Sequence, residues 1–137
     1  MTNISVRYIV DDVDAAVDFY TSLLQFEVAM RPGPGFAMLR RGELRLLLNS
    51  PGAGGAGQTL TDGGRPEPGG WNRFQLEVGD LDAAVTTLRN AGAELRGDVI
   101  TGRGGRQALV PDPAGNLVEL FEPFGPSDPS DPSDPVA

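Results

Sequence analysis

The chain opens on a segment of alternating polar and apolar residues, 4–10, which predicts a β-strand with two different faces. One face carries the more apolar side chains, and the other carries a mixed set that is open to other uses. The first face is formed by Val6, Tyr8 and Val10, and the second by Ser5, Arg7 and Ile9.

After residue 12 the apolar spacing lengthens to three and four residues, which predicts a helix with Asp12 as its N-cap. Residues 26–30 then return to an extended pattern. Two further strands, 36–40 and 43–48, flank a tight turn at Arg41-Gly42. The order strand, helix, strand, strand, strand describes the first half. The apolar stripe of the helix is Val13, Val17, Tyr20 and Leu24.

The second half repeats the first. Residues 10–17 return sixty-eight positions later as residues 78–85, with six of the eight residues identical. A strand at 73–78 precedes a helix that Asp80 caps and that ends near Gly92. Shorter strands are expected at 93–95 and 107–110, and a last one at 116–121. The chain is therefore predicted to be an α+β protein of two βαβββ modules.

Module 1 covers about residues 4–48 and module 2 about residues 71–123, within a single domain over residues 1–125. Residues 49–70, between the modules, are dense in glycine and proline, which indicates a flexible linker; a lid is the alternative. Residues 126–137 read Pro-Ser-Asp three times before Pro-Val-Ala, and this composition predicts a disordered tail.

Composition narrows the functional classes. The chain has 137 residues, 39% of them hydrophobic, which suits one compact domain without disulfides. No signal-peptide pattern opens the chain and no apolar stretch reaches the ~20 residues of a membrane span, so a cytoplasmic protein is expected. The net charge of −8 argues against nucleic acid or an anionic membrane as partner and favours a neutral or cationic ligand.

The chain contains no histidine, cysteine or lysine, and all eleven basic residues are arginines. Any catalysis must therefore rest on carboxylates, hydroxyls or guanidinium groups. Zinc, nickel and iron sites usually recruit imidazole or thiolate ligands, so no transition-metal site is predicted and no cofactor is expected. A metal site made only of oxygen ligands is the alternative, and no residue pattern supports it.

The repeat, the helix start Asp12-Val13-Asp14 with Phe19-Tyr20, and the segment from Asp112 to Leu120 (DPAGNLVEL) resemble the vicinal oxygen chelate superfamily. This family includes glyoxalase I, extradiol dioxygenases, fosfomycin-resistance enzymes and bleomycin-resistance proteins. The resemblance covers nearly all of residues 4–123. It implies that each module curls into half a barrel and that the ligand lies in the concave cleft.

The resemblance also implies four metal-ligand positions, which here are Ser5, Leu46, Arg73 and Glu119. Only Glu119 is a usual metal ligand. Leucine offers no lone pair, and the charge of an arginine would repel a cation. The resemblance therefore transfers the fold but not the metal chemistry.

Arg73 and Glu119 are expected to form an ion pair in place of the metal, either for ligand contact or only for structure. Trp71 stands at the expected mouth of the cleft, where a flat aromatic ligand could stack. Period-two alternation supplies the rest of the predicted ligand-binding set. The set is Ser5, Arg7, Ile9, Phe36, Met38, Leu46, Leu48, Trp71, Arg73, Gln75, Glu119 and Phe121.

Three functions compete. The favoured one is metal-free, non-catalytic sequestration of a hydrophobic, aromatic or glycopeptide antibiotic, as in the bleomycin-resistance branch, by a homodimer with its sites at the subunit interface. The second is a metal-free isomerase or cyclase, with Glu119 or Glu77 as general base and Arg73 as oxyanion partner. The third is an interaction module whose half-barrels are filled by side chains and bind no small molecule.

Overall fold

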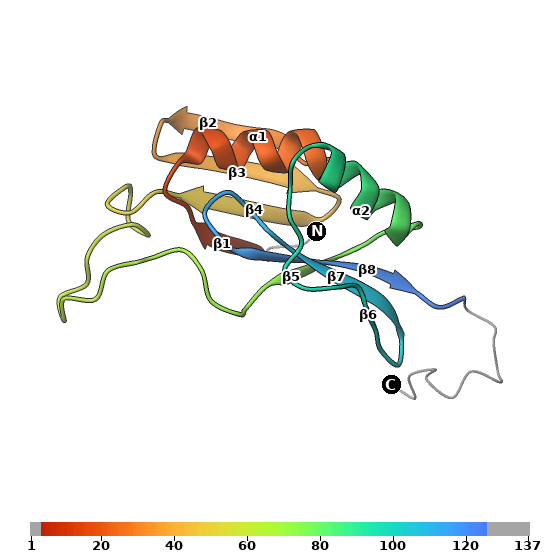
Figure 1. Cartoon of the computed structure of the whole chain (residues 1–137). Helices are drawn as coiled ribbons and strands as arrows, with labels where there is room; N and C mark the ends of the chain where they lie inside the picture. Colours follow the sequence, from red (N-terminus) through yellow and green to blue (C-terminus); the bar gives the residue numbers. More distant parts are fainter. Residues whose placement is uncertain (1–3, 126–137) are drawn as a thin grey trace. The chain divides into compact units, whose positions relative to one another are not determined.

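The computed structural model describes residues 4–125, so the tail predicted to be disordered lies outside the described residues. Two segments of the same architecture follow one another along the chain (Figure 1). The first contains β1 (Ser5–Ile9), α1 (Val13–Leu23), β2 (Glu27–Gly33), β3 (Phe36–Arg41) and β4 (Leu44–Asn49). The second contains β5 (Phe74–Glu77), α2 (Leu81–Asn90), β6 (Ile100–Thr101), β7 (Gly105–Pro111) and β8 (Leu117–Pro123).

Each segment forms a four-stranded mixed sheet of the same topology, with strand orders β1-β4-β3-β2 and β5-β8-β7-β6. The first strand pairs in parallel with the last, and the remaining pairs are antiparallel. These two sheets with their helices confirm the predicted α+β fold of two βαβββ modules.

Both helices begin at the predicted aspartates. The Asp12 carboxylate accepts a 3.0 Å hydrogen bond from the Ala15 N–H, and Asp80 accepts an equal bond from the Ala83 N–H. Each carboxylate satisfies one of the N–H groups that a helix leaves unpaired at its start. After α2, Gly92 has a φ of 90°, a conformation that glycine adopts without steric cost.

In the first sheet, α1 packs against β2, β3 and β4 (Figure 1). Strand pairing aligns Val6 with Leu46 and Tyr8 with Leu48, so these side chains share the helix-covered face. Burying such side chains stabilises the fold by roughly 1.5–3 kcal/mol each. The buried members of this core include Tyr8, Ala16, Phe19, Tyr20, Ala37, Leu39, Leu46 and Leu48.

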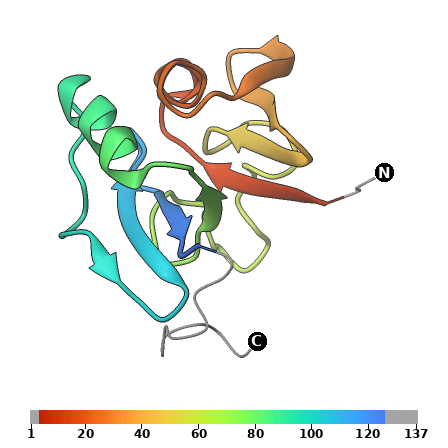
Figure 2. The same ribbon diagram turned by 90° about the vertical axis from the view of Figure 1, so that its right-hand side faces the viewer.

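The second sheet is built in the same way, with α2 against β7 and β8 (Figure 2). Strand pairing aligns Phe74 with Val118 and Leu76 with Leu120, so these side chains share the face that α2 covers. In both sheets the opposite face, here called the open face, is left without a helix from its own module. The buried core of the second sheet includes Phe74, Leu76, Leu81, Val85, Leu88, Ala108, Val110, Val118 and Leu120.

The chain forms two compact units. The first runs to Trp71 and also takes in the turn Asp112–Asn116, and the second contains Asn72–Pro111 and continues from Leu117. The turn belongs to the first unit although the strands that it joins, β7 and β8, belong to the second.

The strand predicted at residues 93–95 is wrong. The Ala93 N–H instead donates to the Leu88 carbonyl at the end of α2, 2.9 Å away. The short edge strand β6 lies further along, at Ile100–Thr101, where it pairs with β7. Ala93, which the alternation pattern assigned to a strand, is therefore bonded to the end of the helix.

Residues 50–70 contain no helix or strand, but part of this segment folds on itself. The Ala53 N–H donates to Ser50, and the Gly57 N–H donates to Ala53, both at 3.0 Å. A Cβ at Gly57 would stand 2.4 Å from the Ser50 carbonyl oxygen, so only glycine fits there. The composition that indicates a linker therefore also builds a hydrogen-bonded loop.

Within residues 4–125, neither helix has the length and apolar character needed to cross a bilayer.

Candidate functional site

The open face of the second sheet carries a polar cluster built from adjacent strands. Glu119 on β8 lies directly opposite Gln75 on β5, and Arg73 immediately precedes β5. Arg73 donates to Glu119 Oε1 from Nε at 3.1 Å and from an Nη atom at 2.9 Å, and the Gln75 amide donates to Oε2 at 2.6 Å. The predicted ion pair is therefore present, with a third member.

The cluster holds a carboxylate that is largely withdrawn from water. Glu119 is 8% exposed, and its side chain receives donors at both oxygens. Burying a carboxylate is costly unless it is paired and hydrogen-bonded, and both conditions are met here. The result is a fixed polar centre on an otherwise mixed face, with Phe121 two residues further along β8.

This donor set does not fit a divalent metal. Such ions are bound by lone pairs, whereas the donors around Glu119 are N–H groups that occupy both of its oxygens. The Arg73 guanidinium places a positive charge where a second ligand would stand. Among residues 4–125 no group of three histidine, cysteine, aspartate or glutamate side chains is suited to a metal ion.

The prediction that Leu46 and Leu48 belong to the ligand face is wrong. Both are fully buried, and their pairing with Val6 and Tyr8 puts them on the face that α1 covers. The equivalent of Glu119 in the first sheet is consequently Leu47, one residue later than the resemblance implies. Leu47 also lacks a lone pair, so the conclusion about metal is unchanged.

The open face of the first sheet carries the remaining predicted residues of that module. Pairing aligns Met38 with Leu47 and Phe36 with Asn49, and both predicted residues are half-buried. Ser5 and Arg7 are exposed, Ile9 is half-buried, and an Arg7 Nη atom donates to Asn49 Oδ1 at 2.7 Å.

Trp71 is 61% exposed and precedes Arg73 by two residues. Its ring is exposed, as a stacking surface requires. The stacking role itself stays a prediction.

Several open-face residues were missed. The alternation predicted for β4 is shifted by one residue, because four of its six residues are leucine and the period is indistinct. The pairing of β4 with β1 would have revealed the correct face, since β1 alternates clearly. The missed residues are Arg40, Arg45, Leu47, Gln107 and Leu109.

A buried polar network within the first unit was also missed. The Tyr20 hydroxyl donates to Asp112 Oδ2 at 2.8 Å, and Asp112 Oδ1 accepts from the N–H groups of Ala114 and Asn116, each at 2.9 Å. The Asn116 amide donates to the Ile9 carbonyl at 2.7 Å. These bonds fix the Asp112–Asn116 turn against β1 and α1.

Burial dominates the titration of this network. It raises the pKa of the Asp112 carboxyl above its ordinary value, although hydrogen bonds from Tyr20 and Asn116 act in the opposite direction. Burial, together with the nearby Asp112, raises the Tyr20 pKa far above that of a free tyrosine. Tyr20 therefore remains a proton donor at any ordinary pH.

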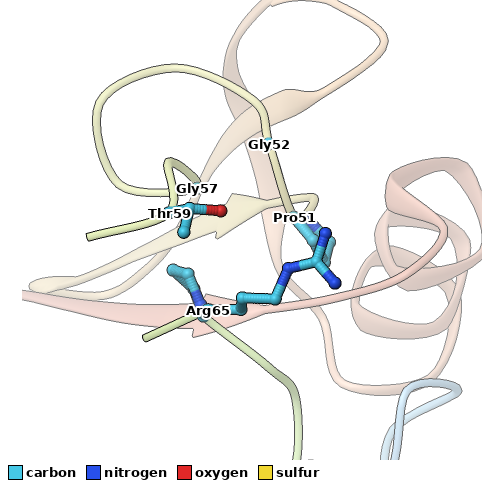
Figure 3. A pocket seen from close by; sticks show the side chains of 6 residues that line it. Pro51, Gly52, Gly57, Thr59 and Arg65 are labelled. Carbon is cyan, nitrogen blue, oxygen red and sulfur yellow. The ribbon is translucent and has the colours of Figure 1, made fainter. Parts of the chain in front are cut away.

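A pocket of about 170 Å³ lies in the loop after β4. Thr59 and Arg65 direct polar atoms toward the space beside Pro51 (Figure 3). Pockets for drug-sized ligands are typically about 300–1,000 Å³, so this one is too small for a polycyclic natural product.

Comparison with known proteins places the fold. The family model described as Glyoxalase/Bleomycin resistance protein/Dioxygenase superfamily matches residues 4–120. No curated protein sequence matches the chain significantly.

Solved structures agree on the fold. Lactoylglutathione lyase from Agrobacterium tumefaciens is 22% identical with a TM-score of 0.71, over 88% of this chain and 92% of that one. TioX from Micromonospora sp. ML1 is 22% identical with a TM-score of 0.72, over 90% and 100% of the two chains. TnmS3, an antibiotic binding protein from Streptomyces sp. CB03234, is 23% identical with a TM-score of 0.67, over 90% and 97%.

Identities this low show a shared fold and do not show whether an activity is shared. The family model spans most of the chain, and the paired βαβββ modules agree with it. The protein therefore belongs to the Glyoxalase/Bleomycin resistance protein/Dioxygenase superfamily.

Proposed function

We propose that this protein binds a hydrophobic or aromatic natural product without a metal ion and without changing it, and so confers antibiotic resistance by sequestration. The observation that carries the proposal is the cluster of Arg73, Gln75 and Glu119. Arg73 and Glu119 stand at two of the positions that the resemblance assigns to metal ligands, and N–H groups of Arg73 and Gln75 donate to both Glu119 oxygens. Sequestration of a ligand requires only contacts with these residues and no reaction catalysed by them.

Each open face, taken by itself, supplies apolar contacts beside fixed polar groups. Phe36, Met38 and Leu47 are half-buried on the first sheet, as are Leu109 and Phe121 on the second. Small-molecule sites combine such walls with a few fixed polar groups. One relative of the same fold, TnmS3, is an antibiotic binding protein, so the fold is compatible with this role.

The alternative is a metal-free isomerase or cyclase with Glu119 as general base. Another relative of the same fold is a lactoylglutathione lyase, so this architecture also supports enzymes. Against this alternative, both Glu119 oxygens already accept hydrogen bonds, and a base needs an oxygen within reach of the substrate proton.

The proposal includes a cytoplasmic homodimer. On the edge strand β2, Val28 and Met30 are 48% and 49% exposed, and apolar side chains on an edge strand favour association. Light scattering coupled to size exclusion is expected to give twice the chain mass. A monomer over the micromolar range would refute the dimer and leave the binding proposal in place.

The experiment is to incubate the purified protein with a panel of aromatic and glycopeptide antibiotics and to identify the bound fraction by mass spectrometry. Sequestration predicts recovery of one unchanged compound, at up to one equivalent per chain. Recovery of an altered compound would instead support catalysis. Recovery of none would count against both functions and favour the interaction module.

A further inference from the structure

Three arginines share the open face of the first sheet. Arg40 on β3 lies directly opposite Arg45 on β4, and Arg45 is in turn aligned with Ser5 on β1. Arg7 lies on the same face of β1, two residues beyond Ser5. The pairing register therefore brings residues far apart in sequence into one cationic group, here called the arginine group: Arg7, Arg40 and Arg45.

No carboxylate neutralises the arginine group within the described residues. Arg7 donates to the neutral amide of Asn49, and neither Arg40 nor Arg45 forms an ion pair with any residue of 4–125. Glu27 is aligned with Arg40 from β2 but lies beyond ion-pair distance. The buried Arg45 Nε also has no hydrogen-bond partner in the part of the chain that the structure describes.

This arrangement of arginines lowers the stability of the folded protein. Like charges directly opposite one another on neighbouring strands are destabilising, as at Arg40 and Arg45. A buried donor without a partner also costs free energy. Residues that reduce stability in this way are typical of functional sites.

The second sheet provides the contrast. Its arginine at the position equivalent to Ser5, Arg73, is matched by Glu119 at 2.9 Å. The charge of that cluster is therefore balanced within the protein. On the first sheet the arginine group adjoins an apolar row formed by Leu47, Met38 and Met30, which pairing aligns with Arg7.

We propose that the open face of the first sheet recognises an acidic group on an aromatic ligand, a carboxylate or sulfonate, with Arg45 and Arg40 as its donors and Met38 and Leu47 as its apolar contacts. This inference rests on the proposed binding function and specifies its ligand class. It also revises the expectation drawn from the net charge, because the local charge of this face is opposite in sign to that of the chain.

The test compares two dyes that differ in one anionic group, anilinonaphthalene sulfonate and the neutral N-phenylnaphthylamine, by fluorescence titration of the full chain. The wild-type protein is expected to bind the sulfonate about tenfold more tightly, as one charge-assisted hydrogen bond would give. Arg45→Gln and Arg40→Gln are each expected to remove most of this difference and to leave the affinity for the neutral dye within about twofold.

Arg41→Gln is the matched control. It removes one arginine charge from β3, the strand that carries Arg40, but on the helix-covered face. It is expected to keep the preference for the sulfonate. Thermal unfolding supplies a second readout: Arg45→Gln and Arg40→Gln should unfold at the wild-type temperature or above it, since each relieves repulsion. Arg40 is exposed, so its variant stays informative if Arg45→Gln folds poorly.

The outcomes separate the two proposals. Equal affinity for both dyes, or a preference for the sulfonate that survives in both variants, would overturn acid recognition and leave hydrophobic binding in place. Loss of neutral-dye binding in Arg40→Gln would also overturn it, since the arginine would then serve the apolar surface. If neither dye binds the folded wild-type protein, acid recognition fails together with the proposed binding face.

Discussion

The Tyr20 hydroxyl donates a 2.8 Å hydrogen bond to the Asp112 carboxylate across ninety-two residues of sequence. Through this contact helix α1 holds the turn between β7 and β8, and the same turn is bonded to β1 through Asn116. The Tyr20 ring itself packs edge-on against Phe19 and Phe26, with centroids 5.2 and 5.4 Å away.

Tyr20→Phe is expected to lower the free energy of unfolding by about 1–3 kcal/mol, because it keeps the ring but leaves a buried carboxylate without one of its donors. Urea unfolding followed by circular dichroism measures the change. Ser22→Ala, which removes an exposed hydroxyl bonded to Asp18, is the control and should alter stability by less than about 0.5 kcal/mol. Equal stability of Tyr20→Phe and wild type would show that the bond contributes nothing.

The stability of the protein is expected to depend on the titration of Asp112. Burial raises the folded-state pKa of this carboxyl above its unfolded value, so ionisation is opposed by folding. The stabilisation is fully present below the ordinary aspartate pKa and is lost as pH rises through the raised one. Relative to Asp112→Asn, the wild type should therefore gain stability as pH falls from neutral toward 4. A difference that widens in the other direction would contradict the sign.

Arg73 and Glu119 are expected to be coupled. Their side chains are 27% and 11% exposed, so each single variant, Arg73→Gln or Glu119→Gln, should cost about 1–2 kcal/mol of unfolding free energy, after allowance for solvent screening. The double variant should cost less than the sum of the two. A double-mutant cycle by urea unfolding measures this, and strict additivity would argue against a direct interaction.

Ligand binding is expected to need no metal. Extensive dialysis against EDTA should leave the affinity for the captured compound unchanged, because the donors at Glu119 are N–H groups and not free lone pairs. Calorimetric titration before and after dialysis tests this. Restoration of lost affinity by added zinc or nickel would overturn the metal-free proposal.

Trp71 reports on the same ligand. Because it is the sole tryptophan and is 61% exposed, a compound that stacks on it should shift and quench its emission. Trp71→Ala and Arg73→Ala should each weaken binding about tenfold, whereas Arg41→Ala should not, since Arg41 lies on the helix-covered side of β3. Unchanged affinity in Trp71→Ala would place the site elsewhere.

Local sequence patterns were enough to predict both helices and most of the strands. Asp12 and Asp80 begin helices because a short carboxylate side chain reaches the backbone N–H three residues ahead, a relationship contained within four residues. The meeting of Arg73 and Glu119 was instead implied by the resemblance to the vicinal oxygen chelate superfamily, which assigns both to metal-ligand positions that the internal repeat locates in this sequence. The helix starts depend on short-range geometry, which a sequence records directly, whereas the ion pair was expected only through the family's shared fold.

Only the tertiary structure decided which face of β4 is open, because five of its six residues are leucine or arginine in an indistinct pattern and pairing with β1 and β3 settles the register. The arginine group follows from that register, so the sequence alone left it hidden. The Tyr20–Asp112 bond was hidden for the same reason: a hydrogen bond between residues far apart depends on how the chain packs, and no local period encodes it.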